Sequence, residues 1–231
     1  MKKFTLKLVP VLTLLMIATL FVSAQSVETR HVSNFTGIAS EGPFYVHIKI
    51  DGTEGVKISS DSDVIKVIET VVENGTLRIK FKDDLHEGEG NTSGPIDIYI
   101  SAKTLTSLVK TGSGSITVDH GVLTGNKVRI VVTGSGNITS SIKSQSANIV
   151  ITGSGSVALN GTTDKSEATI TGPGVLNSQH LEIKDASVLI NGSGSAYLTA
   201  DNSITAHVNG TGNIVYSGNA KVISGSAKKA E

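Results

Sequence analysis

The sequence predicts an all-β fold, a single-stranded β-helix of about six coils with 18–22 residues each. The first observation is a Gly-x-Gly motif that recurs at nearly constant spacing, with first glycines 22, 19, 19, 20 and 18 residues apart. The second is the strict alternation of apolar and polar residues around each motif, as in Ala147, Ile149 and Ile151 before Gly153. A period near 20 residues indicates a solenoid whose coils bury their apolar residues only by stacking. Alternation of period two indicates that each coil is built of strands.

The glycines of each motif share the inward parity of the aliphatic residues around them. We therefore expect structural corners, where the strand bends and the interior has no room for a side chain. A phosphate loop is not indicated, because no copy continues as Gly-x-Gly-x-x-Gly or ends in Gly-Lys-Ser/Thr. Calcium-binding nonapeptide repeats are also rejected, since these corners lack the required aspartate and have twice the period. The predicted corner glycines are Gly112, Gly114, Gly134, Gly136, Gly153, Gly155, Gly172, Gly174, Gly192, Gly194, Gly210 and Gly212.

The chain opens with a predicted secretory signal peptide, residues 1–24. Its start is basic, residues 8–22 are mostly apolar, and small residues lead to the expected cleavage point after Ala24. The apolar run is shorter than the roughly 20 residues of a membrane-spanning helix. We therefore expect an exported protein of the periplasm, the outer surface or the medium, with no transmembrane segment in the mature chain.

The mature chain has little charge and no cysteine. Removal of the signal peptide leaves 17 basic and 20 acidic residues, so the basic surface that nucleic acid or an anionic membrane requires is not expected. Without cysteine, stability comes from packing and strand hydrogen bonds, and thiol catalysis is excluded. We expect no nucleic-acid partner and no cofactor.

Residues 25–105 differ from the repeats in composition, with 21 charged residues in positions 25–104 against 12 in positions 105–219. Alternation predicts strands at 44–50 and 96–100, and Asn74-Gly75 predicts a hairpin between 67–72 and 76–81. Helical periodicity is not convincing anywhere, and residues 62–73 are the weakest assignment. We expect this part to start or cap the solenoid, residues 106–220 to form the repeat β-helix, and residues 221–231 to form a partial coil with a charged tail.

Several of these segments together resemble a known family. They are Arg30-His-Val-Ser-Asn-Phe-Thr-Gly-Ile38, Glu41-Gly-Pro-Phe-Tyr-Val46, Asn74-Gly-Thr-Leu77 and the repeated Gly-Ser-Gly-x-Ile corners. The combination is similar to the putative auto-transporter adhesin, head GIN domain family, over roughly residues 30 to 220. The resemblance implies an exported bacterial domain built as a right-handed β-helix, and it brings no catalytic or ligand residues. Pro173 in the fourth corner departs from the pattern and predicts a local distortion, because proline cannot donate to the strand ladder.

Uncharged side chains form the most regular outward feature. Stacked about 4.8 Å apart, they would make a ladder of hydroxyl and amide groups along the corners. Such residues suit a tight corner and hydrogen-bond along the stack, which is a purely structural interpretation. The functional alternative is a face for a glycan or a protein partner. Its candidate residues are Ser113, Ser135, Asn137, Ser154, Ser193, Tyr197, Thr211 and Asn213.

Two charged features compete with this interpretation. The acidic segment 83–89 could hold a cation, although its spacing fits no known metal loop and charge runs are usually solvated. The acids of the repeats, among them Asp164, Asp185 and Asp201, fall at different offsets from their glycines and form no evident row. The six histidines are scattered and are treated as surface residues.

The sequence therefore favours a non-catalytic, adhesin-like binding module over two alternatives. A carbohydrate-active enzyme would need paired carboxylates, or a base beside cationic groups, on adjacent coils. A structural envelope protein would associate only with itself, so a second copy of the chain is also a candidate partner.

Overall fold

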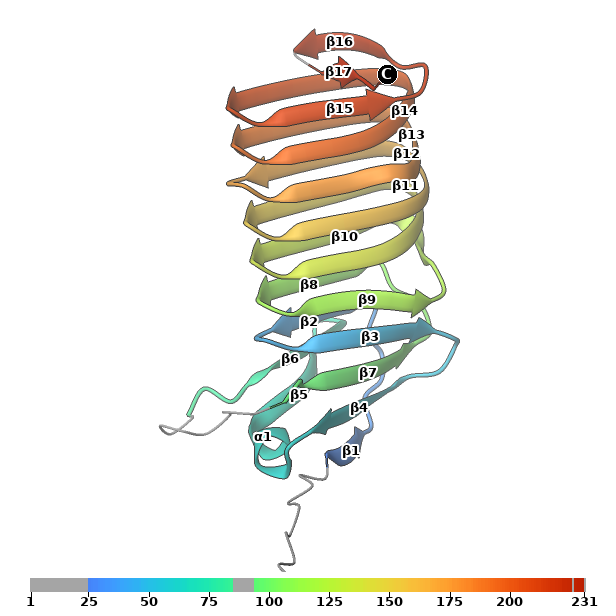
Figure 1. Ribbon diagram of the computed structural model, residues 1–231. Helices are drawn as coiled ribbons and strands as arrows, with labels where there is room; N and C mark the ends of the chain where they lie inside the picture. The colour runs from blue at the N-terminus through green and yellow to red at the C-terminus, as the bar shows by residue number, and fades with distance from the viewer. Residues whose placement is uncertain (1–24, 85–93, 226, 231) are drawn as a thin grey trace, which may run out of the picture.

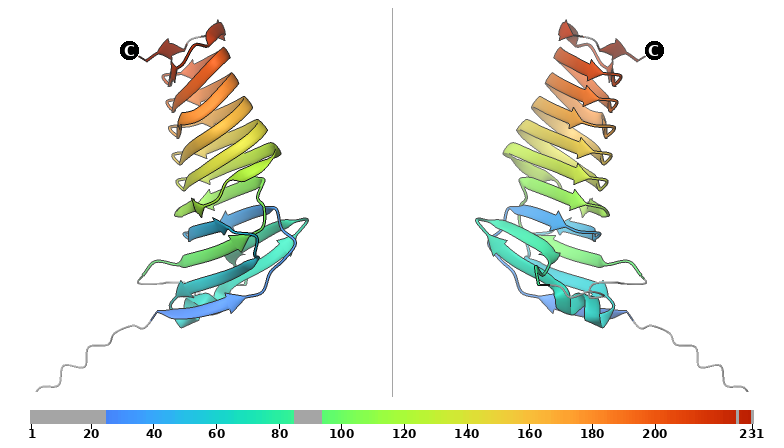
Figure 2. Two further views of the ribbon diagram at one scale, coloured as in Figure 1. Left: turned by 90° about the vertical axis from the view of Figure 1, so that its right-hand side faces the viewer. Right: turned by 90° about the vertical axis from the view of Figure 1, so that its left-hand side faces the viewer.

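The computed structural model describes residues 25–84, 94–225 and 227–230, and these residues form the predicted β-solenoid (Figure 1). The predicted signal peptide and residues 85–89 of the acidic segment lie outside the described residues. Each coil has two extended arms that face each other across a thin core, and the glycine corners join the arms along one edge (Figures 1 and 2). The expected all-β fold class is confirmed.

The repeats form long strands that bend at the edge opposite the glycine corners. These strands are β10 (Leu123–Gly134), β11 (Asn137–Gly153), β12 (Ser156–Thr171), β13 (Val175–Gly192) and β14 (Ser195–Gly210). Neighbouring coils pair in parallel and place equivalent residues opposite each other, such as Ile138 opposite Val157 and Ile151 opposite Ile170. These four side chains are at most 1% exposed, because each inward residue is covered by its equivalents above and below.

Shorter strands complete the two sheets. The front sheet contains β9 (Ser115–His120), β15 (Asn213–Ser217) and the halves of the long strands that follow each corner. The back sheet contains β8 (Ser107–Gly112), β16 (Lys221–Gly225) and the halves that lead into each corner. The two-residue strand β17 (Lys228–Lys229) pairs with β15 at the C-terminal end.

The N-terminal part adds two further coils, and their order in space differs from their order in the chain. Strands β2 (Gly37–Glu41) and β3 (Tyr45–Ile50) pair in parallel with β8 and β9 and so form the coil beneath the first Gly-Ser-Gly corner. Strands β6 (Thr76–Phe81) and β7 (Asp97–Ala102), which come later in the chain, pair in parallel with β2 and β3 from below. The segment from 37 to 50 is therefore enclosed between coils formed by later residues.

Antiparallel strands close the N-terminal end. Strand β4 (Gly55–Ser60) pairs antiparallel with β7, β1 (Ser26–Arg30) pairs antiparallel with β4, and β5 (Ile68–Glu73) pairs antiparallel with β6. The β5–β6 pair confirms the predicted hairpin at Asn74-Gly75, where both residues have positive φ. The weakest sequence assignment contains a six-residue helix, α1 (Ser62–Val67). The guanidinium of Arg30 donates to the carbonyls of Ile65 and Ile68 and so ties β1 to the end of this helix.

The corners are built from two glycines with different physical constraints. Gly192 has a φ of 128°, and a Cβ there would lie 3.0 Å from the carbonyl oxygen of Gly172 in the preceding coil. Gly194 does not need a positive φ, but a Cβ there would lie 2.7 Å from both the Gly174 carbonyl oxygen and the Ile170 side chain. At this corner the backbones of successive coils are therefore too close for a side chain at either glycine.

The proline corner keeps the strand register on both sides. Thr171 stays opposite Thr152 of the coil below, and Val175 stays opposite Ser156. Pro173 is exposed at the tip and cannot donate the hydrogen bond that the tip N–H groups of Ser154 and Thr211 donate to the preceding corner. The ladder is regular at the corner itself, and a register shift follows in the same coil between Asn177 and His180.

A buried lysine lies where the N-terminal coils meet the repeats. Lys110 is 0% exposed and occupies the inward row that Val132 and Ile151 fill in the next coils. Its ammonium donates to the carbonyl oxygen of Gly42 at 2.5 Å and lies 3.4 Å from the hydroxyl of Ser40. Burial lowers the pKa of Lys110 from 10.5 to about 8.

Candidate functional site

The predicted corner ladder exists as a row of exposed side chains. Five corners have an exposed hydroxyl residue at the tip, and Pro173 interrupts the row between the third and the fourth; the five are Ser113, Ser135, Ser154, Ser193 and Thr211. The remaining candidates lie on the front sheet, with Asn137 and Asn213 in the row next to the corner and Tyr197 in the row after it.

Some of the polar groups near the corners hydrogen-bond to the neighbouring coil. The Ser156 hydroxyl donates to the Asn137 side-chain oxygen at 2.7 Å, and the Asn209 amide donates to the Asn191 side-chain oxygen at 2.9 Å. These bonds are the ones that the structural interpretation of the ladder anticipates. The assignment of the ladder as a ligand face remains a prediction.

A second group of side chains gathers on the same front sheet, over the N-terminal strands. Strands β9, β3, β7, β4 and β1 lie side by side in that order, so one outward position from each can form a row. The register places His47 opposite Tyr99, Tyr99 opposite Lys57, and Lys57 opposite Thr29. Outward parity and strand order together therefore create a line of aromatic and cationic side chains.

His47 lies at the centre of this group, between two carboxylates. Its Nδ1 is 3.4 Å from Asp119 Oδ2, and its Nε2 is 3.5 Å from Asp97 Oδ1. Its ring lies nearly parallel to that of Tyr99, with an interplanar angle of 20° and a centroid distance of 5.1 Å. The Lys57 ammonium is 5.3 Å from the centroid of the Tyr99 ring, within the range of a cation–π contact. The two rings are thus held in place by charged side chains on both sides.

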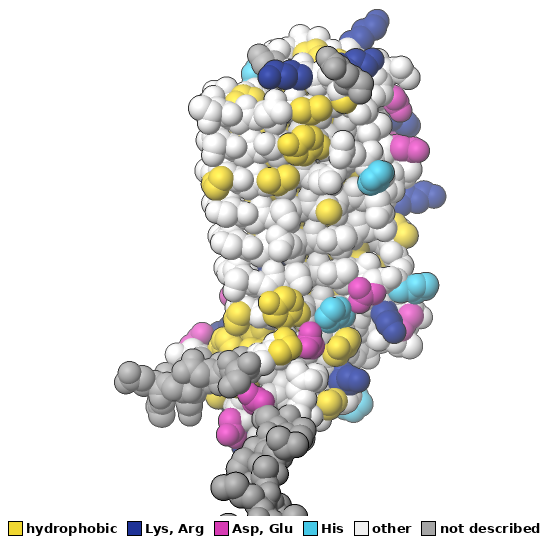
Figure 3. All heavy atoms as spheres, viewed as in Figure 1, with side chains coloured by type: hydrophobic (Ala, Val, Ile, Leu, Met, Phe, Trp, Pro, Cys, Tyr) yellow, Lys and Arg dark blue, Asp and Glu magenta, His cyan; other side chains and the backbone are white. Residues whose placement is uncertain are grey.

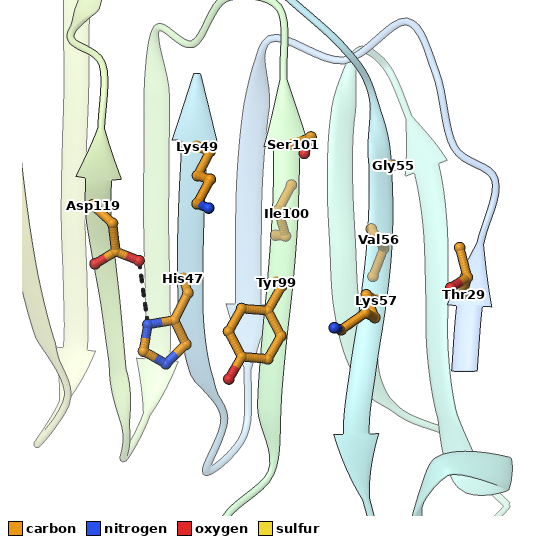
Figure 4. A pocket seen from close by; sticks show the side chains of 10 residues that line it. All are labelled: Thr29, His47, Lys49, Gly55, Val56, Lys57, Tyr99, Ile100, Ser101 and Asp119. Atoms are coloured by element: carbon orange, nitrogen blue, oxygen red, sulfur yellow. Dashed lines mark ion pairs between the residues drawn. The ribbon is translucent and has the colours of Figure 1, made fainter. Parts of the chain in front are cut away.

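These residues line a hollow of about 430 Å³. Figure 4 shows the His47 and Tyr99 rings broadside on neighbouring strands, with Lys57 turned toward Tyr99 and Asp119 turned toward His47. Figure 3 shows the same face of the molecule, where charged and histidine side chains concentrate over the N-terminal strands and along one edge, while the coils above are mostly uncharged. The hollow has the size and the mixed aromatic and polar lining of a small-molecule site. Its lining residues are Thr29, His47, Lys49, Gly55, Val56, Lys57, Tyr99, Ile100, Ser101 and Asp119.

Sequence reasoning missed this site although half of its signal was available. The alternation of Val46, Ile48 and Ile50 already places Tyr45, His47 and Lys49 outward. In the same way Ile98 and Ile100 place Asp97, Tyr99 and Ser101 outward. What the sequence did not provide was the pairing of β3 with β7, which joins segments about 50 residues apart. The histidine was therefore assigned to the surface as an isolated residue, and Tyr197 was taken as the only aromatic candidate.

The acids of the repeats are closer together than their offsets suggested. Asp164, Glu182 and Asp201 line one hollow of about 240 Å³ at the bend opposite the glycine corners, together with Lys184. The register slips between Ser178 and Glu182, so coils of different length bring different offsets to the same place. The register places no acid of this bend opposite another acid, since Asp164 contacts Lys184 and Asp185 lies opposite Lys165 and Ser203, so these acids share a hollow without forming a row.

Hydrogen bonds between coils satisfy several of these charges. Lys184 contacts Asp164 at 2.7 Å, and this bond raises the pKa of Lys184. Asp185 accepts hydrogen bonds from Ser203 and Asn202, which lower the pKa of its carboxyl. Within the described residues no set of histidine and acidic side chains is arranged to hold a metal ion. Of the acidic segment 83–89 only Asp83 and Asp84 are described, and Asp83 pairs with Lys80 at 2.6 Å; the remainder of that candidate cation site lies outside the described residues.

The comparisons with known proteins agree with the fold. The family model for the putative auto-transporter adhesin, head GIN domain, matches residues 34–220. None of the curated proteins shows significant similarity to the sequence. In the part of the chain that the structure describes, no helix is long and apolar enough to span a membrane.

Three solved structures illustrate the structural similarity. A putative adhesin from Bacteroides fragilis is 23% identical with a TM-score of 0.78, and the match covers 90% of this chain and 94% of that chain. A putative lipid binding protein from Parabacteroides distasonis is 21% identical with a TM-score of 0.71, over 90% and 97% of the two chains. A putative adhesin from the same species is 19% identical with a TM-score of 0.69, over 90% and 95%. At these identities the likeness establishes the shared fold.

Proposed function

The chain belongs to the putative auto-transporter adhesin, head GIN domain family, and we propose that it is an exported, adhesin-like protein that binds a glycan through its front sheet. Family membership supports the adhesin-like role. Glycan binding and export are the finer parts of the proposal, and each is argued from this chain's own residues.

Export rests on the N-terminal segment. A basic start, an apolar stretch and small residues ending at Ala24 are the features that a secretion machinery and its peptidase read. Expression of the full chain in a bacterium, followed by mass determination of the N-terminus, tests this directly. A mature protein that begins at Gln25 is expected, and an intact Met1 in the cytoplasmic fraction would contradict export.

The observation that carries glycan binding is the hollow floored by His47 and Tyr99. Aromatic faces carry negative partial charge and attract the polarised C–H groups of a sugar ring. Hydroxyl, carboxylate and ammonium groups surround the floor, with Ser101, Asp119 and Lys57 each from a different strand. Because all of these strands belong to one hydrogen-bonded sheet, the groups are held in fixed relative positions before any ligand arrives.

The test is binding of the mature chain, residues 25–231, to a broad glycan array. Tyr99→Ala removes half of the aromatic floor, while Tyr197→Ala removes a tyrosine from the second outward row of the same sheet, within the predicted corner face. We expect saturable binding that Tyr99→Ala weakens at least tenfold and Tyr197→Ala leaves within twofold. If only Tyr197→Ala abolishes binding, the glycan site lies on the corner face instead. If no glycan on the array binds, the proposal of glycan binding is wrong. Phospholipid vesicles form a separate arm, because one of the similar structures is described as a putative lipid binding protein.

The same side chains keep the enzyme alternative testable. A base beside cationic groups on adjacent strands was the arrangement that a polysaccharide-cleaving enzyme would require, and His47 with Lys49 and Lys57 comes near it. Product analysis of each bound glycan decides between the two functions. Intact glycans after long incubation support a binding protein, whereas shortened products that disappear with His47→Gln would establish catalysis. Sedimentation of the unliganded protein addresses the third alternative, self-association.

A further inference from the structure

Two lysines and one acid lie among the residues that line the hollow on the front sheet. The lysines are Lys49 and Lys57, the acid is Asp119, and a second carboxylate, Asp97, lies beside the hollow at 3.5 Å from His47 Nε2. The mature chain as a whole has 17 basic and 20 acidic residues. The hollow therefore presents two ammonium groups on a slightly acidic protein, and ammonium groups attract anions.

The two lysines are not consumed by ion pairs within the protein. Other lysines of this part of the fold pair directly with acids, as Lys103 does with Glu54 at 2.6 Å and Lys80 with Asp83 at 2.6 Å. Neither Lys49 nor Lys57 has a carboxylate within ion-pair distance among the described residues. Lys49 acts on Asp51 only through space, and the Asp51 carboxyl is held by Thr53. Neither ammonium is neutralised by a carboxylate of the described residues, and the Lys57 ammonium lies 5.3 Å from the centroid of the Tyr99 ring, at the hollow itself.

The remaining lining is suited to a sugar rather than to a simple ion. The stacked His47 and Tyr99 rings provide aromatic surface in the hollow, and Ser101 and Thr29 provide hydroxyls among its lining residues (Figure 4). A volume of about 430 Å³ exceeds what an inorganic anion fills and is comparable to one or two sugar rings. An anion alone would leave the aromatic floor without a partner.

We infer that the hollow binds a carboxylate-bearing saccharide, with the sugar ring on His47 and Tyr99 and the carboxylate facing Lys49 and Lys57. This inference rests on the proposed glycan binding and specifies its ligand class. Uronic acids and sialic acids are two sources of the same chemistry, a pyranose ring with a carboxylate attached. Asp119 and Asp97 both lie against His47, at 3.4 and 3.5 Å, and so leave the carboxylate of the ligand to the lysines.

The experiment compares matched saccharides on the full mature chain by isothermal titration. A uronic-acid tetrasaccharide is titrated beside the same tetrasaccharide with its carboxylates methyl-esterified, and sialyllactose is titrated beside lactose. We expect the acidic member of at least one pair to bind at least tenfold more tightly than its uncharged counterpart. Its affinity should fall as salt is raised from 50 to 500 mM, because added ions screen the charge of the exposed lysines; the Debye length is about 10 Å at 0.1 M salt. Which pair responds identifies the source of the carboxylate.

Substitutions assign the effect to the hollow. Lys49→Gln and Lys57→Gln should each weaken acidic-saccharide binding about fivefold or more, Lys57→Arg should retain it, and Lys143→Gln on the exposed surface of a repeat coil should not change it. All three positions are exposed, so folding is checked by the far-ultraviolet spectrum alone. Equal affinity for acidic and esterified saccharides would overturn the inference while leaving glycan binding intact. Absence of binding to any saccharide would overturn both, and an unchanged affinity in both Gln variants would place the carboxylate elsewhere.

Discussion

Lys110 provides the sharpest test of how the N-terminal coils join the repeats. The perturbation is Lys110→Met, which keeps the length of the buried side chain and removes its amine. The wild-type ammonium is buried with no carboxylate of the described residues as a partner, and its shortest contact is the carbonyl oxygen of Gly42 in the preceding coil. In later corners the equivalent carbonyl receives backbone N–H groups instead, as Gly134 does from Ser154 and Gly155. At the junction the Lys110 ammonium thus takes the place of a backbone N–H group as the hydrogen-bond donor to the corner carbonyl.

The pH dependence follows from the lowered pKa of Lys110. Below pH 8 the amine is charged in both the folded and unfolded states, and the cost of burying that charge is fully present. Between about pH 8 and pH 10.5 the folded state releases its proton while the unfolded state keeps it, so the free energy of unfolding rises with pH. The separation of the two pKa values corresponds to about 3 kcal/mol in total. At pH 7 the methionine variant avoids this cost but leaves the Gly42 carbonyl unpaired, at about 1–3 kcal/mol.

The assay is urea unfolding of both proteins at pH 7, 8, 9 and 10, and the quantity compared is wild type minus variant. This difference should be small at pH 7 and should grow in favour of the wild type by about 2–3 kcal/mol toward pH 10. Taking the difference cancels groups that titrate in both proteins, such as Lys80 and Lys184, whose pKa values are raised by their acidic partners. Lys143→Met, an exposed lysine, serves as the control and should show a flat difference. Parallel curves for wild type and Lys110→Met would refute the buried charge.

Three further predictions concern the repeats and the cap. Gly194→Ala should destabilise the protein by several kcal/mol or prevent folding, because the added Cβ would lie 2.7 Å from the Gly174 carbonyl oxygen. Gly55→Ala is the control, since no atom lies within 4 Å of its Cβ, and it should change the unfolding free energy by less than about 1 kcal/mol. Thermal unfolding of both variants tests this. Asp185→Asn should reduce the loss of stability on acidification below about pH 5. Hydrogen bonds from Ser203 and Asn202 lower the pKa of the Asp185 carboxyl in the folded state, and the stability they contribute is lost as that carboxyl is protonated. Urea midpoints of both proteins at pH 7 and pH 3.5 measure this loss, and an equal loss in both proteins would contradict the prediction. Arg30→Met should release β1 from the carbonyls of Ile65 and Ile68 and speed amide hydrogen exchange in residues 26–30, while exchange in β12 stays unchanged. Equal protection of β1 in both proteins would show that its pairing with β4 is enough to hold β1 in place.

The repeats could be predicted almost completely because one local rule is copied from coil to coil. The parity of Ile149, Ile151 and Val157 fixes which side chains point inward, and each coil buries them against its neighbours in the same register. The corner glycines could be recognised for the same reason, since the regular spacing of the Gly-x-Gly motifs along the sequence is visible without any knowledge of long-range pairing. Only the bend opposite the corners escaped, because bulges near Ser178 and Ile183 make the coils differ in length there.

The N-terminal part was harder to predict because its pairings cross the chain order. Gly42-Pro43-Phe44 stacks on Gly112-Ser113-Gly114 and is a seventh corner of the solenoid, but its second glycine is replaced by Phe44. A search for Gly-x-Gly cannot find it. The backbone of Phe44 lies close beneath Gly114, the one second glycine with a positive φ, so the first Gly-Ser-Gly corner is shaped by a segment 70 residues earlier.

The position of the candidate site follows from this difference between the two halves. In the repeats the outward rows at the corners are copied along the stack, which yields similar small polar residues such as the exposed serines. Rows of this kind do not bring a cation, an acid and two aromatic rings to one point. The N-terminal strands come from unrelated segments, so neighbouring positions of a row carry different chemistry, as His47, Tyr99 and Lys57 do. The regular coils then act as the rigid extension of the sheet on which this group is mounted. If the hollow is the binding site, exchanging repeat coils for one another should leave ligand affinity unchanged, whereas any slip in the pairing of β3 with β7 should abolish it.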